Sequence, residues 1–156
     1  MLPREGTKGT KKVCVLCLLC LLVASCRNHS ATDLTVAAQE YASTLEKLAG
    51  SPPVLDLIHL GLGPDGHTAS LVPGDPVLQV DGVAVAATGI YQGRRRLTLT
   101  YPVLNRARRI LWLITGSDKV GMLARLRQGD PTIPAGRVNQ ENAVILADRA
   151  AAGEKD

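Results

Sequence analysis

The apolar run "VLDLIHLGL" (residues 54–62) constrains the fold more than any other part of this 156-residue sequence. The prolines of "SPP" precede it and a turn-rich segment follows, so it has the length of a strand. A strand that is apolar at nearly every position is typical of a parallel sheet covered on both faces. It continues into "GLGPDGHTAS" (residues 61–70), where no packing requirement explains three glycines, a proline, an aspartate and a histidine. We therefore expect a buried strand followed by a functional loop.

The rest of the chain alternates between predicted helices and strands from residue 33 onward. The spacing of apolar residues predicts a helix over 33–49, with Thr32 or Asp33 as its N-cap and Gly50 as its end. Further strands are predicted in "VAVAAT", "RRLTLTYP", "RRILWLITG" and "AVILAD", a short helix in "HTASLV", and a turn or short helix in "LNRA". This alternation predicts an α/β fold with an open, mostly parallel sheet and helices on both faces.

A second well-marked helix is predicted in "SDKVGMLARLRQG". Its expected N-cap is Ser117 and its expected end is Gly129. Helical spacing predicts that one face of this helix points inward, formed by Val120, Leu123, Ala124 and Leu126.

The basic residues are unevenly distributed. Residues 1–30 hold five basic residues and one acidic residue, which accounts for the whole formal net charge of +4, and residues 31–156 hold thirteen of each. The chain has only three tyrosines, one tryptophan and no phenylalanine. A neutral body with few aromatic side chains argues against a nucleic-acid surface.

Residues 1–30 have the order of a leader, with a basic stretch, the apolar "VCVLCLLCLLVAS" and then small residues. All four cysteines lie in this segment, and their absence from the body suits a reducing compartment. "VASC" also resembles a lipoprotein cleavage box that would lipidate Cys26. We expect a cytoplasmic protein in which residues 1–30 are leader-like or foreign, with a lipoprotein anchored through Cys26 as the alternative.

The loop and its surroundings resemble the 6-phosphogluconolactonase family, in the sugar-phosphate group that also contains glucosamine-6-phosphate deaminase/isomerase. The resemblance runs from Asp33 to Ala152 through "LDLIHLGLGPDGHTASLVPG", "RRRLTLTYPVLNRARRILWLITGSDK" and "IPAGRV". It implies a Rossmann-type sheet and hydrolysis of 6-phospho-D-glucono-1,5-lactone to 6-phospho-D-gluconate, the second oxidative step of the pentose phosphate pathway. It implies no metal and no cofactor.

Family members begin with a strand and a glycine-rich phosphate loop, and residues 1–32 resemble neither. We therefore expect residues 31–156 to be a partial domain that lacks the family's N-terminal strands. An open sheet edge would favour self-association of this chain. The alternatives to a lactonase are an inactive or weakly sugar-phosphate-binding fragment and a deaminase-like isomerase, although "GPDGHTASL" followed by "RLTLT" resembles the lactonase pattern more closely.

The predicted catalytic residues are His67 and Asp65. An imidazole titrates near neutrality, so His67 can take a proton from water and return it to the departing ring oxygen. Asp65 either orients that ring or serves only as a turn residue in "PDG". Gly61, Gly63 and Gly66 permit positive φ and close approach, which would let their amides face the lactone oxygen.

Other residues of these motifs are predicted to hold the substrate. Thr68 and Ser70 either cap the expected short helix or touch sugar hydroxyls. Arg96 matches an arginine that the family carries before its strand, and Lys119 lies in the first turn of a predicted helix, where an anion is favoured. The predicted partner is therefore a small sugar-phosphate lactone. No second ligand at metal spacing accompanies His67, and His59 is expected to be a core or interface residue.

Overall fold

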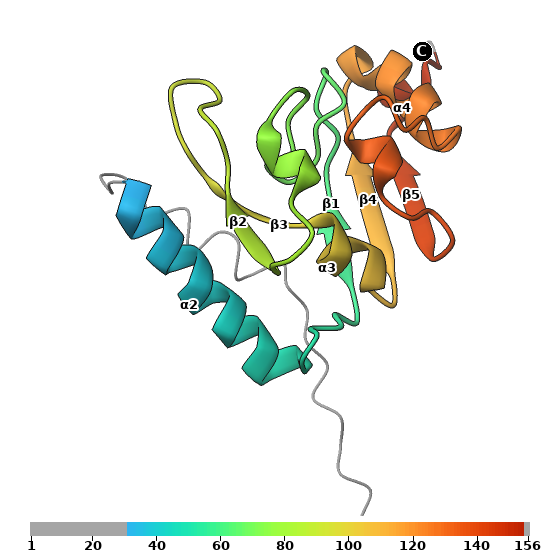
Figure 1. The fold of residues 1–156 in the computed structure, drawn as a ribbon. Coiled ribbons are helices and arrows are strands. Elements are labelled where there is room, and N and C mark those ends of the chain that lie inside the picture. Colours follow the sequence, from blue (N-terminus) through green and yellow to red (C-terminus); the bar gives the residue numbers. More distant parts are fainter. Residues whose placement is uncertain (1–30, 155–156) are drawn as a thin grey trace, which may run out of the picture.

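Three strands form a parallel sheet in residues 31–154, the part of the chain that the computed structural model describes (Figure 1). They are β1 (Ile58–Leu60), β4 (Ile110–Ile114) and β5 (Ala143–Ala147), in the spatial order β1-β4-β5. The register places Leu60 beside Trp112 and Trp112 beside Ile145. The expectations for residues 1–30, including Cys26, lie outside the described residues.

One face of this sheet is part of the hydrophobic core. Alternate residues along β1 and β4 point to it, and each of them is almost fully buried: Ile58, Leu60, Ile110, Trp112 and Ile114. Leu113 of β4 and Val144 and Leu146 of β5 point to the opposite face and are exposed. Along β4 and β5 the sheet is therefore covered on one face only. This differs from the prediction, since apolar runs of this kind are typical of a sheet covered on both faces.

A separate hairpin carries the second set of strands. β2 (Val85–Ala87) pairs with β3 (Leu97–Leu99) in antiparallel register and not with the parallel sheet. The helix α2 (Ala31–Ala49) packs against β2, so these elements form one side of the molecule in Figure 1. Gly50 ends this helix at φ 89°, as predicted.

The remaining helices are short and follow the strands. They are α3 (Tyr101–Arg106), α4 (Val120–Arg127) and α5 (Arg149–Ala152), with 3₁₀ turns at Pro76–Gln79, Ser117–Lys119 and Ala135–Arg137. The α/β class with a parallel sheet is confirmed, and β2 and β3 are its antiparallel exception. None of the helices in residues 31–154 is long and apolar enough to cross a membrane.

The start of the helix around residue 120 differs from the prediction. Ser117 is not an N-cap but the first residue of a 3₁₀ turn, because Gly116 precedes it at φ 98° and takes the cap position. Leu123 and Leu126 are buried as expected, whereas Val120 and Ala124 are exposed. The 3₁₀ turn shifts the inward face away from these two residues. Gly129, at φ 62°, ends the segment as predicted.

Candidate active site

The loop that follows β1 closes on itself through backbone hydrogen bonds. It lies beyond the carboxyl end of a parallel strand, which is where open α/β sheets bind ligands. The Gly63 N–H donates to the His67 carbonyl at 2.8 Å, and the Gly66 N–H donates to the Gly63 carbonyl at 3.0 Å. These two bonds hold residues 63–67 in one compact turn, so the side chains of this turn have a fixed arrangement.

Asp65 and His67 form a hydrogen-bonded pair within that turn. His67 Nδ1 lies 2.6 Å from Asp65 Oδ1, and the same oxygen accepts the His67 backbone N–H at 3.1 Å. The His67 side chain is 25% exposed and that of Asp65 is 35% exposed. Asp65 therefore orients the ring, the first of the two roles predicted for it, while the ring itself remains accessible.

The charge of Asp65 fixes which ring nitrogen of His67 carries a proton. Desolvation alone would raise the pKa of Asp65, but hydrogen bonds from the His67 backbone and ring, with the charge of the ring, lower it below its usual value. Asp65 is therefore ionised at neutral pH and can only accept a hydrogen bond. Nδ1 of the neutral ring must donate, which leaves the Nε2 lone pair of His67 free to accept a proton.

The glycines of the loop serve a different purpose from the one predicted. The amides of Gly63 and Gly66, predicted to face the lactone oxygen, donate to carbonyls inside the loop. Gly63 is required for close approach, because a Cβ there would overlap His67 Nδ1 and lie 2.7 Å from Asp65 Oδ1. Gly66 has φ 82°, and a Cβ there would lie 2.8 Å from the Ile133 side chain. Gly63 thus makes room for the Asp65–His67 pair and Gly66 for the contact with Ile133, and both amides are used within the fold.

The short helix predicted in "HTASLV" does not form. Thr68 and Leu71 exchange two backbone hydrogen bonds, and Ala69 between them has φ 51°, so the chain makes a tight reversal that buries Leu71 completely. The Thr68 hydroxyl is buried and donates to the Gly61 carbonyl at 2.9 Å, and the Ser70 amide donates to the Thr98 hydroxyl at 3.3 Å. The capping role expected of Thr68 and Ser70 is therefore wrong.

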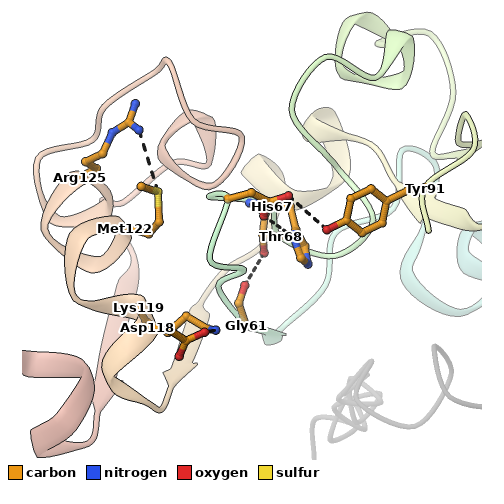
Figure 2. Close-up of polar contacts among 9 residues, drawn as sticks. Gly61, His67, Thr68, Tyr91, Asp118, Lys119, Met122 and Arg125 are labelled. Carbon is orange, nitrogen blue, oxygen red and sulfur yellow. Dashed lines mark hydrogen bonds and ion pairs between the residues drawn. The ribbon is translucent and has the colours of Figure 1, made fainter.

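Tyr91 joins the Asp65–His67 pair from a distant part of the sequence (Figure 2). Its hydroxyl donates to Asp65 Oδ2 at 3.2 Å, and its ring packs edge-on against the His67 ring with centroids 5.7 Å apart. No local pattern points to this residue, because it lies 26 positions from Asp65 on the connection between β2 and β3. Its position follows only from the way the hairpin packs beside the loop.

The two cations predicted to hold phosphate occupy different surroundings. The Arg96 guanidinium lies over the Tyr91 ring, 5.5 Å from its centroid, and thus near the Asp65–His67 pair. Lys119 forms an ion pair with its neighbour Asp118, and its side chain is only 17% exposed. Within residues 31–154, no hydrogen bond joins Lys119 to the loop. Arg94 and Arg95, which have no predicted role, are exposed.

His59 does not contribute to this arrangement. It lies in β1, is half-buried, and its Nε2 atom is buried without a hydrogen-bond partner, as expected of a core residue. In the described part of the chain, no three His, Cys, Asp or Glu side chains gather closely enough to hold a metal ion.

Sequence comparison places the chain among known proteins. Residues 22–146 match the family described as "Glucosamine-6-phosphate isomerases/6-phosphogluconolactonase". The chain is 40% identical over 123 residues to the 6-phosphogluconolactonase of Rattus norvegicus, a match that covers 74% of this chain and 48% of the rat protein. It is 38% identical over 125 residues to that of Synechocystis sp., covering 78% of this chain and 52% of the relative. The chain thus spans about half the length of these curated relatives.

Comparison of structures gives the same grouping. The 6-phosphogluconolactonase of Trypanosoma brucei superposes with a TM-score of 0.68 at 27% identity, over 81% of this chain and 55% of that one. A monomeric glucosamine-6-phosphate deaminase superposes with a TM-score of 0.66 at 22% identity, which indicates a shared fold only. The sequence match covers most of the chain, and the fold and loop agree with it, so this chain belongs to the glucosamine-6-phosphate isomerase/6-phosphogluconolactonase family.

Proposed function

We propose that this chain carries the hydrolytic site of a 6-phosphogluconolactonase and converts 6-phospho-D-glucono-1,5-lactone to 6-phospho-D-gluconate. The observation that carries the proposal is the 2.6 Å contact between His67 Nδ1 and Asp65 Oδ1, which leaves Nε2 as a free base at the carboxyl end of a parallel strand. The names of the similar enzymes, at about 40% identity, support the choice of substrate.

The first step is attack of water on the lactone carbonyl carbon. His67 Nε2 accepts a proton from the water as the new carbon–oxygen bond forms, and the carbonyl electrons move onto oxygen to give a tetrahedral intermediate. The ring becomes an imidazolium that Asp65 stabilises through Nδ1. Because Asp65 is already ionised and hydrogen-bonded to the ring, the pair needs no rearrangement when the positive charge appears.

The second step opens the lactone. The carbonyl re-forms as the bond to the ring oxygen breaks, and the His67 imidazolium returns its proton to that oxygen, which becomes a hydroxyl. The product acid then loses a proton to solvent. One histidine thus acts as base and as acid in turn, and the neutral ring is restored at the end of the cycle.

The phosphate of the substrate is assigned to Arg96 and Lys119. The Arg96 side chain is half-buried over Tyr91, so it can place a charge beside the base without covering it. The pair that Lys119 makes with Asp118 is exposed on the aspartate side, so the ammonium can exchange that partner for a phosphate oxygen. Thr68 holds the loop and is not assigned a contact with substrate.

We also propose that the protein acts in the cytoplasm. The proposal rests on the body of the chain, residues 31–156, which holds no cysteine, as suits a reducing compartment. Lipidation at Cys26 is the competing possibility, and mass spectrometry of the protein from its native cell distinguishes the two.

The deciding experiment is turnover of 6-phosphogluconolactone by the purified 156-residue chain. The lactone is generated in place, 6-phosphogluconate is quantified over time, and spontaneous hydrolysis is subtracted. We expect hydrolysis above the spontaneous rate that disappears in His67→Ala. A parent chain that gives the spontaneous rate would argue against this function, and an active His67→Ala chain would argue against the assigned base.

A further inference from the structure

The hairpin that carries Tyr91 has a rigid tip. Tyr91 and Arg94 exchange two backbone hydrogen bonds, of 2.9 and 3.2 Å, and the two residues between them have positive φ, 51° at Gln92 and 73° at Gly93. Two central residues of this kind are typical of a type I′ turn, whose twist matches that of the flanking chains. The backbone of Tyr91 is therefore held by contacts that do not involve its side chain.

Two contacts tie this hairpin to the loop of the Asp65–His67 pair. The first is the Tyr91 hydroxyl on Asp65 Oδ2, and the second is the Thr98 hydroxyl, which accepts the Ser70 amide from within β3. The Thr98 contact is buried, whereas Tyr91 and Asp65 are half-buried. The hairpin and the loop are thus joined at both ends of the segment 65–70.

The two oxygens of the Asp65 carboxylate accept hydrogen bonds from two different residues, His67 and Tyr91. Oδ1 accepts the His67 backbone N–H and ring, and Oδ2 accepts the Tyr91 hydroxyl. Desolvation and the Asp65 carboxylate raise the pKa of Tyr91, so its hydroxyl keeps the proton that it donates. A carboxylate held at one oxygen only can rotate about its terminal bond, which is broad and two-fold. With both oxygens held, the plane of Asp65 is fixed and so is the oxygen that His67 Nδ1 meets.

We propose that Tyr91 is a positioning residue, whose hydroxyl orients Asp65 and thereby holds His67 in the Nδ1–H tautomer that the reaction needs. The Tyr91 ring also packs edge-on against the His67 ring, with centroids 5.7 Å apart, and this contact limits movement of the imidazole toward the tyrosine. The Arg96 guanidinium lies over the Tyr91 ring, 5.5 Å from its centroid, and this contact helps to keep the tyrosine in place. The catalytic role of the tautomer rests on the proposed lactonase function, but the tautomer itself does not.

The test measures the tautomer of His67 directly in the full 156-residue chain without substrate. The ¹⁵N NMR chemical shifts of the imidazole nitrogens are recorded at about pH 8.5, two units above the ordinary imidazole pKa. The signals of His67 are assigned by their loss in His67→Gln. In Tyr91→Phe, which keeps the ring and removes the hydroxyl, we expect the minor Nε2–H tautomer to rise about threefold or more, the change expected from losing one modest hydrogen bond.

Tyr41→Phe is the matched control. The Tyr41 hydroxyl is buried in the core without a hydrogen-bond partner, so its removal tests the effect of losing a tyrosine hydroxyl elsewhere. An unchanged tautomer in Tyr91→Phe, or an equal change in Tyr41→Phe, would overturn the inference.

Turnover gives a second and separate readout. If the lactonase function holds, Tyr91→Phe should lower kcat by about threefold to tenfold, because Asp65 is then less well placed to stabilise the imidazolium that forms in the reaction. KM should change little, because the ring that supports Arg96 is retained. A parent chain without lactonase activity would refute the proposed function and leave the tautomer measurement to decide the role of Tyr91.

Discussion

The loop of residues 61–70 and the outer face of the parallel sheet differ in the contacts that their side chains make. In the loop, Asp65, His67 and Thr68 each have a hydrogen-bond partner within the fold. The outer face, formed by Leu113, Val144 and Leu146, presents apolar side chains that are 43%, 54% and 52% exposed. Leu113 pairs with Leu146 in register, so the exposed side chains adjoin across two strands.

This difference separates two kinds of substitution. A change in the loop breaks directed contacts that set the position of one ring, so its main effect is on chemistry. A change on the outer face removes nondirectional apolar surface that is already partly in water, so its main effect is on association. The predictions below test this division, beginning with the largest expected effect.

His67→Ala should have the largest effect. Loss of a positioned general base usually lowers the rate by about two to four orders of magnitude, and the side chain is accessible enough that folding should change little. Lactone hydrolysis above the spontaneous rate and the free energy of unfolding are measured on the same preparation. Near-normal turnover in the variant would remove His67 from the mechanism.

Gly63→Ala should come next, because a methyl group there occupies the space of His67 Nδ1 and displaces the ring. Misplacement by about 1 Å can cost on the order of 100-fold in rate, and we expect a fall of that size in kcat. Gly61→Ala is the comparison, since a Cβ there meets only the Leu113 carbonyl oxygen at 4.0 Å. Equal losses in the two variants would contradict the claim that close approach is specific to Gly63.

Arg96→Gln and Lys119→Gln should weaken binding of the phosphorylated substrate selectively. A charge-assisted bond to phosphate contributes roughly 1.5 to 3 kcal/mol, so KM for the phosphorylated lactone should rise about tenfold or more. KM for unphosphorylated gluconolactone should hardly change. Arg94→Gln, at an exposed neighbouring position, is the control. Equal effects on both lactones would indicate a structural role for the two cations.

The local sequence predicts most of the fold and half of the site. The apolar runs of β1 and β4 and the helix α2 follow from periodicity and turn residues. The spacing of two positions places Asp65 near His67 but leaves open whether Asp65 orients the ring or only forms the turn. The contact of Tyr91 with Asp65 could not be predicted in this way, because it depends on how a hairpin packs against a loop 26 residues away. Tertiary contacts of this kind leave no periodic signal.

The errors have a similar origin. "HTASLV" has residues that suit a short helix, but the burial of Leu71 and the bond from Thr68 to Gly61 favour a tight reversal. The strands in "VAVAAT" and "RRLTLTYP" are predicted for a mostly parallel sheet, yet β2 and β3 pair with each other as an antiparallel hairpin. In both cases, contacts between distant segments outweigh local preference.

Substitutions on the outer face of the sheet should have the smallest effect on activity and stability. In Val144→Thr combined with Leu146→Thr, both positions carry a β-branched residue, which suits a strand. Because these side chains are about half exposed, the free energy of unfolding should change by no more than about 0.5 kcal/mol per position.

The same change removes most of the exposed apolar surface of β5, so self-association of the chain should fall. Light scattering across a concentration series measures it, with Leu48→Gln on α2 as control, since Leu48 is equally exposed but lies on a helix away from this face. If the double variant associates as strongly as the parent chain, or if Leu48→Gln reduces association as much as the double variant does, then the outer face of the sheet is not the surface through which the chain self-associates.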